Sequence, residues 1–333
     1  MQEHLLEIKG LKTHFQTERG RVTAIDGISF HVDRGEVLAI VGESGCGKSV
    51  TAQSILRLFE ENGVTTYEGE INFDSKNLID STDSEMRKIR GNEISMIFQD
   101  PLSSLNPVYT IGDQIMESIM LHQKVSKKVA YQRAIEMLKL IGIPAPEQRV
   151  DEYPHQISGG MRQRVMIAIA LACQPKLLIA DEPTTALDVT IQSQILEIID
   201  RLRQELDMGI LLITHDLGVV AQHCSRVAVM YLGEVVEEGD VHSLFENPLH
   251  PYTKGLIDSI PQLYGDRNKK LSIIKGMVPS LNNIPRGCRF APRCPFADSK
   301  CINEKPELET LENNKRIMCW HYKKIEEAAV NAT

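Results

Sequence analysis

The sequence predicts an α/β fold, in which a core with a buried parallel sheet is followed by a smaller, loop-rich segment. Short apolar runs alternate with segments of helical spacing, as they do in parallel α/β cores. A mainly helical stretch over residues 100–172 interrupts that alternation as an insertion. After about residue 248 proline and short polar turns become frequent. We therefore expect one domain over residues 1–248 and a C-terminal extension over residues 249–333.

The N-terminal region has the alternation typical of strands. Residues 5–15 and 22–32 predict two β-strands joined by turn residues at 18–20, which gives an N-terminal antiparallel β subdomain. Residues 36–41 are a short apolar run, as expected of a strand that is buried on both faces. Residues 50–59 then have helical spacing.

The rest of the core follows the same two patterns. Three segments of the insertion repeat apolar residues every three or four positions, which predicts helices over residues 113–123, 127–142 and 161–174. Alternation then resumes. We expect a buried strand at 176–181, a helix at 190–206, a strand at 209–216, a hairpin at 225–240 and a short helix at 242–248.

Charge and hydropathy restrict the class of function. Of the 333 residues, 42% are apolar and 25% are charged, which is an ordinary globular composition. The formal net charge of −8 disfavours a protein that grips nucleic-acid backbones. No stretch approaches the roughly 20 apolar residues that span a bilayer, and the N-terminus lacks the pattern of a secretory signal. We therefore expect a cytoplasmic location, with any membrane role exercised by docking to another subunit.

The first chemical motif lies between the expected strand at 36–41 and the helix that follows. It fits the phosphate-loop pattern of glycine, four residues, glycine, lysine and serine. Glycines let backbone N–H groups converge on phosphate oxygens, and the helix N-terminus favours negative charge. Lys48 can reach the β- and γ-phosphates, and the Ser49 hydroxyl can ligate Mg²⁺. The expected nucleotide contacts are Gly42, Glu43, Ser44, Gly45, Cys46, Gly47, Lys48, Ser49 and Val50.

Two acidic residues end the strand expected at 176–181. Asp181 and Glu182 would lie at the carboxyl edge of the parallel sheet, where α/β folds bind their ligands. Such a pair can also cap a helix, but together with a phosphate loop it indicates chemistry. Asp181 suits Mg²⁺, and Glu182 suits a general base that polarises the water attacking the γ-phosphate.

A second glycine-rich loop precedes the helix expected at 161–174. Ser158, Gly159 and Gly160 place small residues at a helix N-terminus, which makes a second anion-binding site. One triphosphate needs only one such cradle within a subunit. We therefore expect this loop, with Met161, to complete the nucleotide site of a neighbouring subunit, so that the working form is a dimer.

Together these motifs resemble the ATP-binding subunits of ABC transporters, whose order and spacing they follow over residues 5–240. The resemblance implies ATP hydrolysis, with Glu182 and His215 as catalytic residues. It also implies Mg²⁺ near Ser49, Gln99 and Asp181, adenine stacking on Phe15 and a D-loop role for Asp188. Taken alone, Phe15 could be strand core, Gln99 a turn residue and His215 an ordinary polar residue.

Two features resemble the peptide-transport branch of that family. Met161 stands where the commonest signature loop has glutamine, and residues 250–256 (HPYTKGL) resemble the extension of oligopeptide and dipeptide importers. The branch implies a peripheral motor on the cytoplasmic face of the cell membrane. Its partners would be a second, distinct ATPase, two transmembrane permease subunits and an external substrate-binding protein. Nickel chelates, glutathione and sugar oligomers are alternative cargoes, and a non-transport ABC ATPase is a more distant alternative.

Four of the seven cysteines lie in the C-terminal extension: Cys288, Cys294, Cys301 and Cys319. They lack the close pairs of a zinc ribbon. Four thiolates from a loop-rich segment suit either tetrahedral Zn²⁺ or a [4Fe–4S] cluster, and spacing alone does not choose between them. The segment resembles that of dipeptide-importer ATPases, in which such cysteines hold an iron–sulfur cluster. The resemblance thus implies [4Fe–4S], with zinc and free thiols as alternatives.

Overall fold

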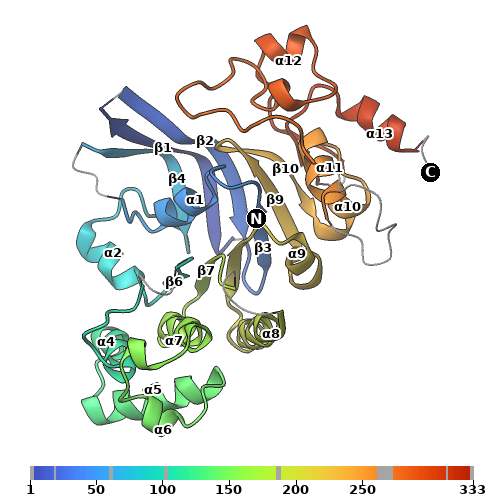
Figure 1. The fold of residues 1–333 in the computed structure, drawn as a ribbon. Helices are drawn as coiled ribbons and strands as arrows, with labels where there is room; N and C mark the ends of the chain where they lie inside the picture. Colours follow the sequence, from blue (N-terminus) through green and yellow to red (C-terminus); the bar gives the residue numbers. More distant parts are fainter. Residues whose placement is uncertain are drawn as a thin grey trace. The chain divides into compact units, whose positions relative to one another are not determined.

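The computed structural model describes residues 4–18, 20–59, 63–100, 104–184, 189–260, 273–312 and 314–330 (Figure 1). The chain divides into two compact units. The first unit contains Met1–Leu5, Val32–Val37 and Phe73–Ile213, and the second contains Leu6–His31, Leu38–Asn72 and Thr214–Thr333.

The first unit contains a parallel sheet whose strands are buried along their whole length. Its strands are β6 (Ile94–Ile97), β7 (Leu177–Asp181) and β8 (Gly209–Ile213), in the order β8-β7-β6. The register pairs Ile97 with Ala180 and Asp181 with Ile213, so the strands end close together. Continuous apolar runs are expected of strands covered on both faces. Two short elements, β5 (Lys76–Asn77) and α2 (Asp83–Ile89), belong to the same unit.

Helices form the rest of the first unit. They are α4 (Ile111–Gln123), α5 (Lys127–Leu140), α6 (Pro146–Arg149), η1 (Pro154–Gln156), α7 (Gly159–Leu171) and α8 (Val189–Leu206). Thr110, Ser126 and Ser158 cap α4, α5 and α7, each accepting a hydrogen bond from a backbone N–H of the first turn. The apolar faces meet in a core that includes Ile115, Ile119, Ala134, Leu138 and Val165.

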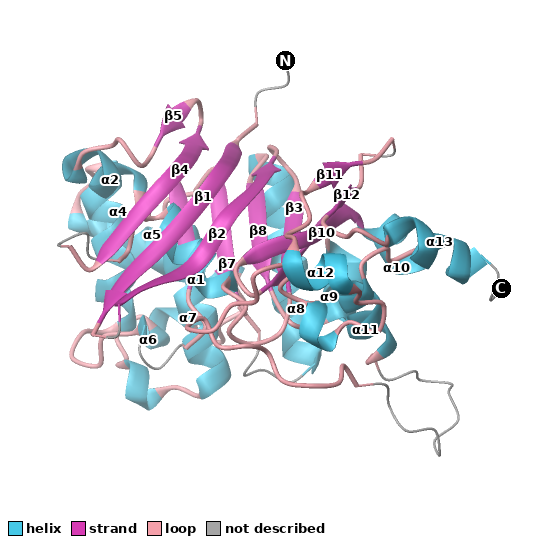
Figure 2. Ribbon diagram, turned by 90° about the horizontal axis from the view of Figure 1, so that it is seen from above, coloured by secondary structure: helices cyan, strands magenta, loops and turns pink. Residues whose placement is uncertain are grey.

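The second unit contains two sheets. One is formed by β1 (Leu6–Thr17), β2 (Gly20–Val32) and β4 (Thr65–Phe73) in the order β2-β1-β4, and these strands lie side by side in Figure 2. The other follows the order β11-β12-β10-β9-β3. Its members are β3 (Val37–Val41), β9 (Arg226–Tyr231), β10 (Glu234–Asp240), β11 (Glu309–Thr310) and β12 (Arg316–Ile317). Strands β3 and β9 are parallel, whereas β9 and β10 form an antiparallel hairpin.

The helices of the second unit include several from the C-terminal extension. They are α1 (Lys48–Ile55), α9 (Leu217–His223), α10 (Val241–Glu246), α11 (Pro251–Asp258), η2 (Ala291–Arg293), α12 (Ser299–Asn303) and α13 (Tyr322–Val330). The extension shares its core with β9, because the rings of Tyr231, Tyr252 and Phe290 pack with centroids 4.7–5.4 Å apart. Each of the three is almost fully buried.

The α/β class, the β subdomain and the helical insertion are confirmed. Helix α7 covers Gly159–Leu171 rather than residues 161–174. Helix α1 also differs, since it covers Lys48–Ile55 rather than residues 50–59. It ends early because Arg57 adopts a left-handed backbone conformation with φ 48°. The sequence patterns also missed β4, α2, β6 and α11, which are short or lack clear periodicity. No helix in the described part of the chain is long and apolar enough to cross a membrane.

Candidate functional site

The predicted phosphate loop connects β3 to α1, and its shape depends on glycine. Gly42 has φ 155°, and a Cβ at this position would lie 2.3 Å from the carbonyl oxygen of Met230. Gly47 has φ 107°, and a Cβ there would lie 3.2 Å from the carbonyl oxygen of Ala24. Neighbouring backbone thus leaves no room for a side chain at Gly42, and the positive φ with close backbone disfavours one at Gly47, so other residues would change the loop.

Lys48 lies inside this loop and is 6% exposed. Its ammonium group donates hydrogen bonds to the carbonyl oxygens of Gly42 (2.8 Å) and Glu43 (3.2 Å). Ser44 and Gly45, at the outer side of the loop, are exposed. A buried cation facing an open loop is suited to phosphate. Burial raises the pKa of the Cys46 thiol, so this cysteine is a packing residue rather than a nucleophile.

His215 lies in the same cavity as the start of the loop. The cavity has a volume of about 800 Å³ and is lined by Val41, Gly42, Glu43, Ser44, His215, Asp216, Leu217, Gly218, Leu256, Ser259, Ile260 and Val278. Asp216, the next residue, caps α9. Its carboxylate accepts hydrogen bonds from the N–H groups of Gly218 and Val219 at the start of that helix. The structure therefore brings His215 and the phosphate loop together, with α11 supplying part of the wall.

Gln99 and Glu182 meet in the first unit. Gln99 follows β6 and Glu182 follows β7, and the Gln99 amide donates a 3.0 Å hydrogen bond to the Glu182 carboxylate. Glu182 has φ 47°, a left-handed conformation that is uncommon outside glycine. Backbone strain of this kind is concentrated at functional sites. Asp181, the last residue of β7, is 2% exposed.

The second glycine-rich loop caps α7 as the sequence predicts. Ser158 Oγ accepts a hydrogen bond of 3.3 Å from Met161 N, and Ser158 and Gly159 are exposed. Two residues that sequence reasoning missed hold this loop. Arg162 donates to the carbonyl oxygens of Pro154 and Ile157, and buried Gln163 donates to that of Pro183, directly after Glu182. The sequence shows only a glutamine near the start of a largely apolar helix, and its burial becomes visible in the fold.

The roles predicted for Phe15 and Asp188 stay predictions. Phe15 is half-buried in β1 and packs edge-to-face against Phe59, with ring centroids 4.9 Å apart. This packing does not test its adenine role. Asp188 of the expected D-loop lies outside the described residues.

The four cysteines of the extension gather through backbone pairing. Cys288 N donates to Cys301 O at 2.8 Å, and η2 carries the chain on to Cys294. Strand β12 pairs with β10, which brings the chain back toward the other cysteines. Cys319 therefore lies within electrostatic reach of the other three thiols. Burial, and after it the neighbouring thiolates, raise the pKa of Cys319 to about 12 and that of Cys288 to about 11. None of the four forms a disulfide.

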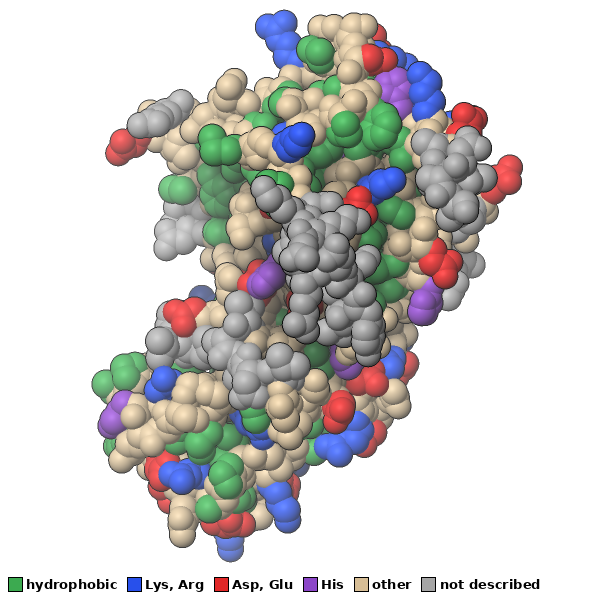
Figure 3. Space-filling model, turned by 45° about the vertical axis from the view of Figure 1, so that its right-hand side comes forward, with side chains coloured by type: hydrophobic (Ala, Val, Ile, Leu, Met, Phe, Trp, Pro, Cys, Tyr) green, Lys and Arg blue, Asp and Glu red, His purple; other side chains and the backbone are tan. Residues whose placement is uncertain are grey.

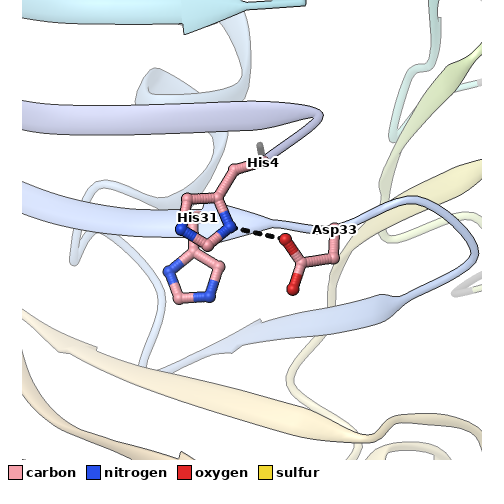
Figure 4. Close-up of side chains that lie close together, drawn as sticks. All are labelled: His4, His31 and Asp33. Atoms are coloured by element: carbon pink, nitrogen blue, oxygen red, sulfur yellow. Dashed lines mark hydrogen bonds and ion pairs between the residues drawn. The ribbon is translucent and has the colours of Figure 1, made fainter. Parts of the chain in front are cut away.

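Histidine–carboxylate contacts also lie outside these motifs. His321 Nε2 lies 3.0 Å from Asp298 Oδ2, and their side chains lie within 4.8 Å of Cys301 Sγ. In the first unit, His4 Nδ1 lies 2.5 Å from Asp33 Oδ1 (Figure 4). Both members of the latter pair are part-exposed, and their contact fixes the start of the chain against the turn before β3.

Comparison with known proteins decides the family. Residues 25–185 match the ABC transporter family, and residues 236–301 match the oligopeptide/dipeptide transporter C-terminal region. The oligopeptide transport ATP-binding protein AppD of Bacillus subtilis (strain 168) is 54% identical over 318 residues, which cover 96% of this chain and 97% of AppD. The chain belongs to the ABC transporter ATP-binding family. It is therefore an ATP hydrolase of the ABC type.

Two further proteins that are similar to this ABC ATPase support the assignment to the family. The dipeptide transport ATP-binding protein DppD of Escherichia coli (strain K12) is 48% identical, covering 96% of each chain. Among solved structures, the dimeric ATP-binding cassette MJ0796 in a post-hydrolysis state with ADP and Pi is similar with a TM-score of 0.64. It is 29% identical and covers 71% of this chain and 98% of its own.

Proposed function

We propose that this ABC ATPase is the motor of an importer for oligopeptides or dipeptides. The observation that carries the proposal is the match of residues 236–301 to the oligopeptide/dipeptide transporter C-terminal region. Relatives named for oligopeptide and dipeptide transport are 48–54% identical along almost the whole chain. The C-terminal extension is packed into the core through Tyr252 and Phe290, so it is an integral part of the second unit.

We assign the chemistry of ATP hydrolysis to residues of the predicted motifs. Lys48 and the loop N–H groups would bind the phosphates, and Phe15 would stack on adenine. Glu182 would take the proton of the attacking water, in an orientation set by its hydrogen bond from Gln99. His215 would contact the γ-phosphate from the cavity beside the loop.

The donor set fits Mg²⁺, which prefers oxygen ligands and keeps several waters. Ser49, Gln99 and Asp181 offer a hydroxyl, an amide oxygen and a carboxylate. When bound, the ion would neutralise charge on the phosphates. Ser49 belongs to α1, Asp181 ends β7 and Gln99 follows β6.

We propose that the chain works with a second, distinct ATPase subunit. Ser158, Gly159, Gly160 and Met161 would complete the nucleotide site of that partner, and Asp188 would belong to the same interface. The exposed N-terminus of α7 supports this, because its N–H groups lie at the surface of the first unit. The dimeric cassette among the similar structures supports it as well.

Two transmembrane permease subunits would dock on the helical part of the first unit, which would place the chain peripherally at the cytoplasmic face of the cell membrane. Large apolar side chains are exposed around α4, including Val108, Tyr109 and Leu121. Hydrophobic side chains are visible among charged ones on the lower part of the surface in Figure 3.

Uptake measurements test the cargo. Deleting the gene should abolish uptake of radiolabelled di- and oligopeptides, and the wild-type gene should restore it, whereas a Glu182→Gln gene should not. Uptake of nickel chelate, glutathione and an oligosaccharide is measured in the same strains. Loss of one of these with peptide uptake intact would replace the peptide cargo by that alternative.

We also propose a [4Fe–4S] cluster held by Cys288, Cys294, Cys301 and Cys319. Four cysteines outside disulfides, whose thiols interact electrostatically, form the donor set that such a cluster takes. Four thiolates suit either tetrahedral zinc or the cluster. The cluster is favoured by the resemblance of this segment to that of dipeptide-importer ATPases. Its role would be to cross-link the extension that we assign to residues 249–333.

A further inference from the structure

The C-terminal extension holds the second residue of the phosphate loop at two points. The carboxylate of Glu43 receives two hydrogen bonds from Arg293, Nη1 to Oε2 at 2.6 Å and Nη2 to Oε1 at 3.0 Å. The backbone N–H of Glu43 donates to the hydroxyl of Tyr252 at 2.8 Å. A bidentate guanidinium–carboxylate pair fixes both orientation and distance.

Arg293 is itself rigidly held. Its side chain is 3% exposed, and its Nε donates to the carbonyl oxygen of Lys275 at 3.1 Å. The guanidinium lies 5.8 Å from the ring centroid of Tyr231 and 5.9 Å from that of Phe290. Exposed ion pairs contribute little because both side chains must be ordered. Here the arginine is ordered by its other contacts, so the pair can position Glu43.

The consequence for the loop follows from a third contact of Glu43. Its carbonyl oxygen accepts a hydrogen bond from the Lys48 ammonium. A chain of contacts therefore runs from Arg293 through Glu43 to the lysine that we assign to the phosphates. Arg293 also neutralises a carboxylate on the loop. Without it, the Glu43 charge would repel a triphosphate at short range, where screening by water is incomplete.

We propose that Arg293 is a positioning residue for nucleotide binding, through which the segment carrying the cysteines controls the shape and charge of the phosphate loop. This inference rests on the proposed binding of ATP by Lys48 and its loop. It adds that the affinity of this loop for nucleotide depends on a residue of the C-terminal extension, with Tyr252 as the second point of attachment.

The test is binding of a fluorescent ATP analogue, TNP-ATP, to the purified full-length chain, with thermal unfolding measured on each variant. Arg293→Gln should weaken binding about tenfold, the scale of a lost charge-assisted hydrogen bond. Arg293→Lys should weaken it less, since the charge stays and the bidentate geometry is lost. The double variant Glu43→Gln/Arg293→Gln should bind within about threefold of wild type, because the uncompensated carboxylate is gone.

Two controls distinguish positioning of Glu43 from a general loss of packing in the extension. Arg289→Gln removes a second buried arginine of the same segment, one that pairs with Asp26 and Glu234 and not with the loop. Equal weakening by Arg289→Gln, or a double variant as weak as Arg293→Gln alone, would reduce Arg293 to a structural role and overturn the proposal. Should Arg293→Gln not unfold cooperatively, Arg293→Lys takes its place in the comparison.

Lys48→Ala separates the inference from the proposed function. If Lys48→Ala loses binding while Arg293→Gln and Arg293→Lys bind as wild type, the inference fails and the ATP site stands. If Lys48→Ala binds as wild type, the ATP site itself fails.

Discussion

Gln99 donates a 3.0 Å hydrogen bond from its side-chain amide to Glu182, joining the segment after β6 to the acidic end of β7. The two residues lie 83 positions apart in the chain. Parallel pairing of β6 with β7 places both strand ends at one edge of the sheet. This hydrogen bond orients the carboxylate of Glu182, the group that we propose as general base.

Glu182→Gln should retain nucleotide binding and lose turnover. The amide keeps an oxygen that can accept from Gln99, so the change removes basicity with little change in geometry. Phosphate release should fall by about 10²- to 10⁴-fold, the usual contribution of a general base, while TNP-ATP binding stays near wild type. Glu197→Gln, on the exposed face of α8, is the matched control. Hydrolysis at the wild-type rate in Glu182→Gln would remove this residue as the base.

Ser158→Arg should impair the nucleotide site of the partner ATPase more than the site containing Lys48. A bulky cation at the α7 N-terminus would block the cradle that the partner's nucleotide is proposed to use. Photolabelling with 8-azido-ATP after vanadate trapping, followed by separation of the two ATPase subunits, reports each site. Ser126→Arg, at the N-cap of α5, is the control for a changed helix cap. Label lost only from the mutated chain would contradict a shared site.

Cys301→Ser should lose the proposed cluster. Anaerobically purified wild-type protein should contain about four iron and four sulfide per chain and absorb broadly in the visible range. Cys301→Ser should lose most of both, whereas Cys173→Ser, a buried cysteine of the first unit, should keep them. Because the thiol pKa values of the free protein are raised, loading should also release protons. A colourless protein with one zinc per chain would replace the cluster by zinc.

His250→Asn should flatten the acid side of the stability curve. Complete burial lowers the pKa of His250 to about 3, from an ordinary value of 6.5. The unfolded chain therefore binds a proton near pH 6.5 that the native protein does not, so stability falls as pH falls below that value. From pH 7.5 to 5, this one residue should cost about 2 kcal/mol.

Asparagine suits the His250 position because its side-chain oxygen can replace Nδ1 as acceptor for the Tyr252 N–H. Urea unfolding at several pH values should show the wild-type free energy of unfolding falling more steeply than that of His250→Asn. His242→Asn, an exposed histidine of α10, serves as the control. Parallel curves for wild type and His250→Asn would contradict the assignment.

Local patterns predicted most of the core. The buried strands β3, β7 and β8, the helices α4, α5 and α7 and the β9–β10 hairpin were all expected, because each carries a complete periodic pattern within a few residues. Helix α11 was missed since it has only eight residues, although the proline at its first position is a start signal. Its burial comes from Tyr252 and its neighbours in the core, which is a tertiary property that periodicity does not report.

Site residues that belong to a short contiguous motif were predicted, whereas contacts between residues distant in the sequence were not. The phosphate loop and Ser158 are short motifs whose meaning depends on adjacent residues. The ion pair of Arg293 with Glu43 joins residues 250 positions apart, and neither residue type is unusual in its own segment. Gln163 was similarly hidden, since only the fold shows that it donates to Pro183 beyond β7.

Strand β12 contains only two residues, yet it decides when the proposed cluster site is complete. Cys319 joins the other three thiols because Arg316 and Ile317 pair with β10. During synthesis the phosphate loop, β10 and three of the cysteines leave the ribosome before this strand exists. A cofactor held by all four thiols would thus be loaded only after translation of the extension is almost finished, and a chain truncated before Arg316 would offer three ligands instead of four.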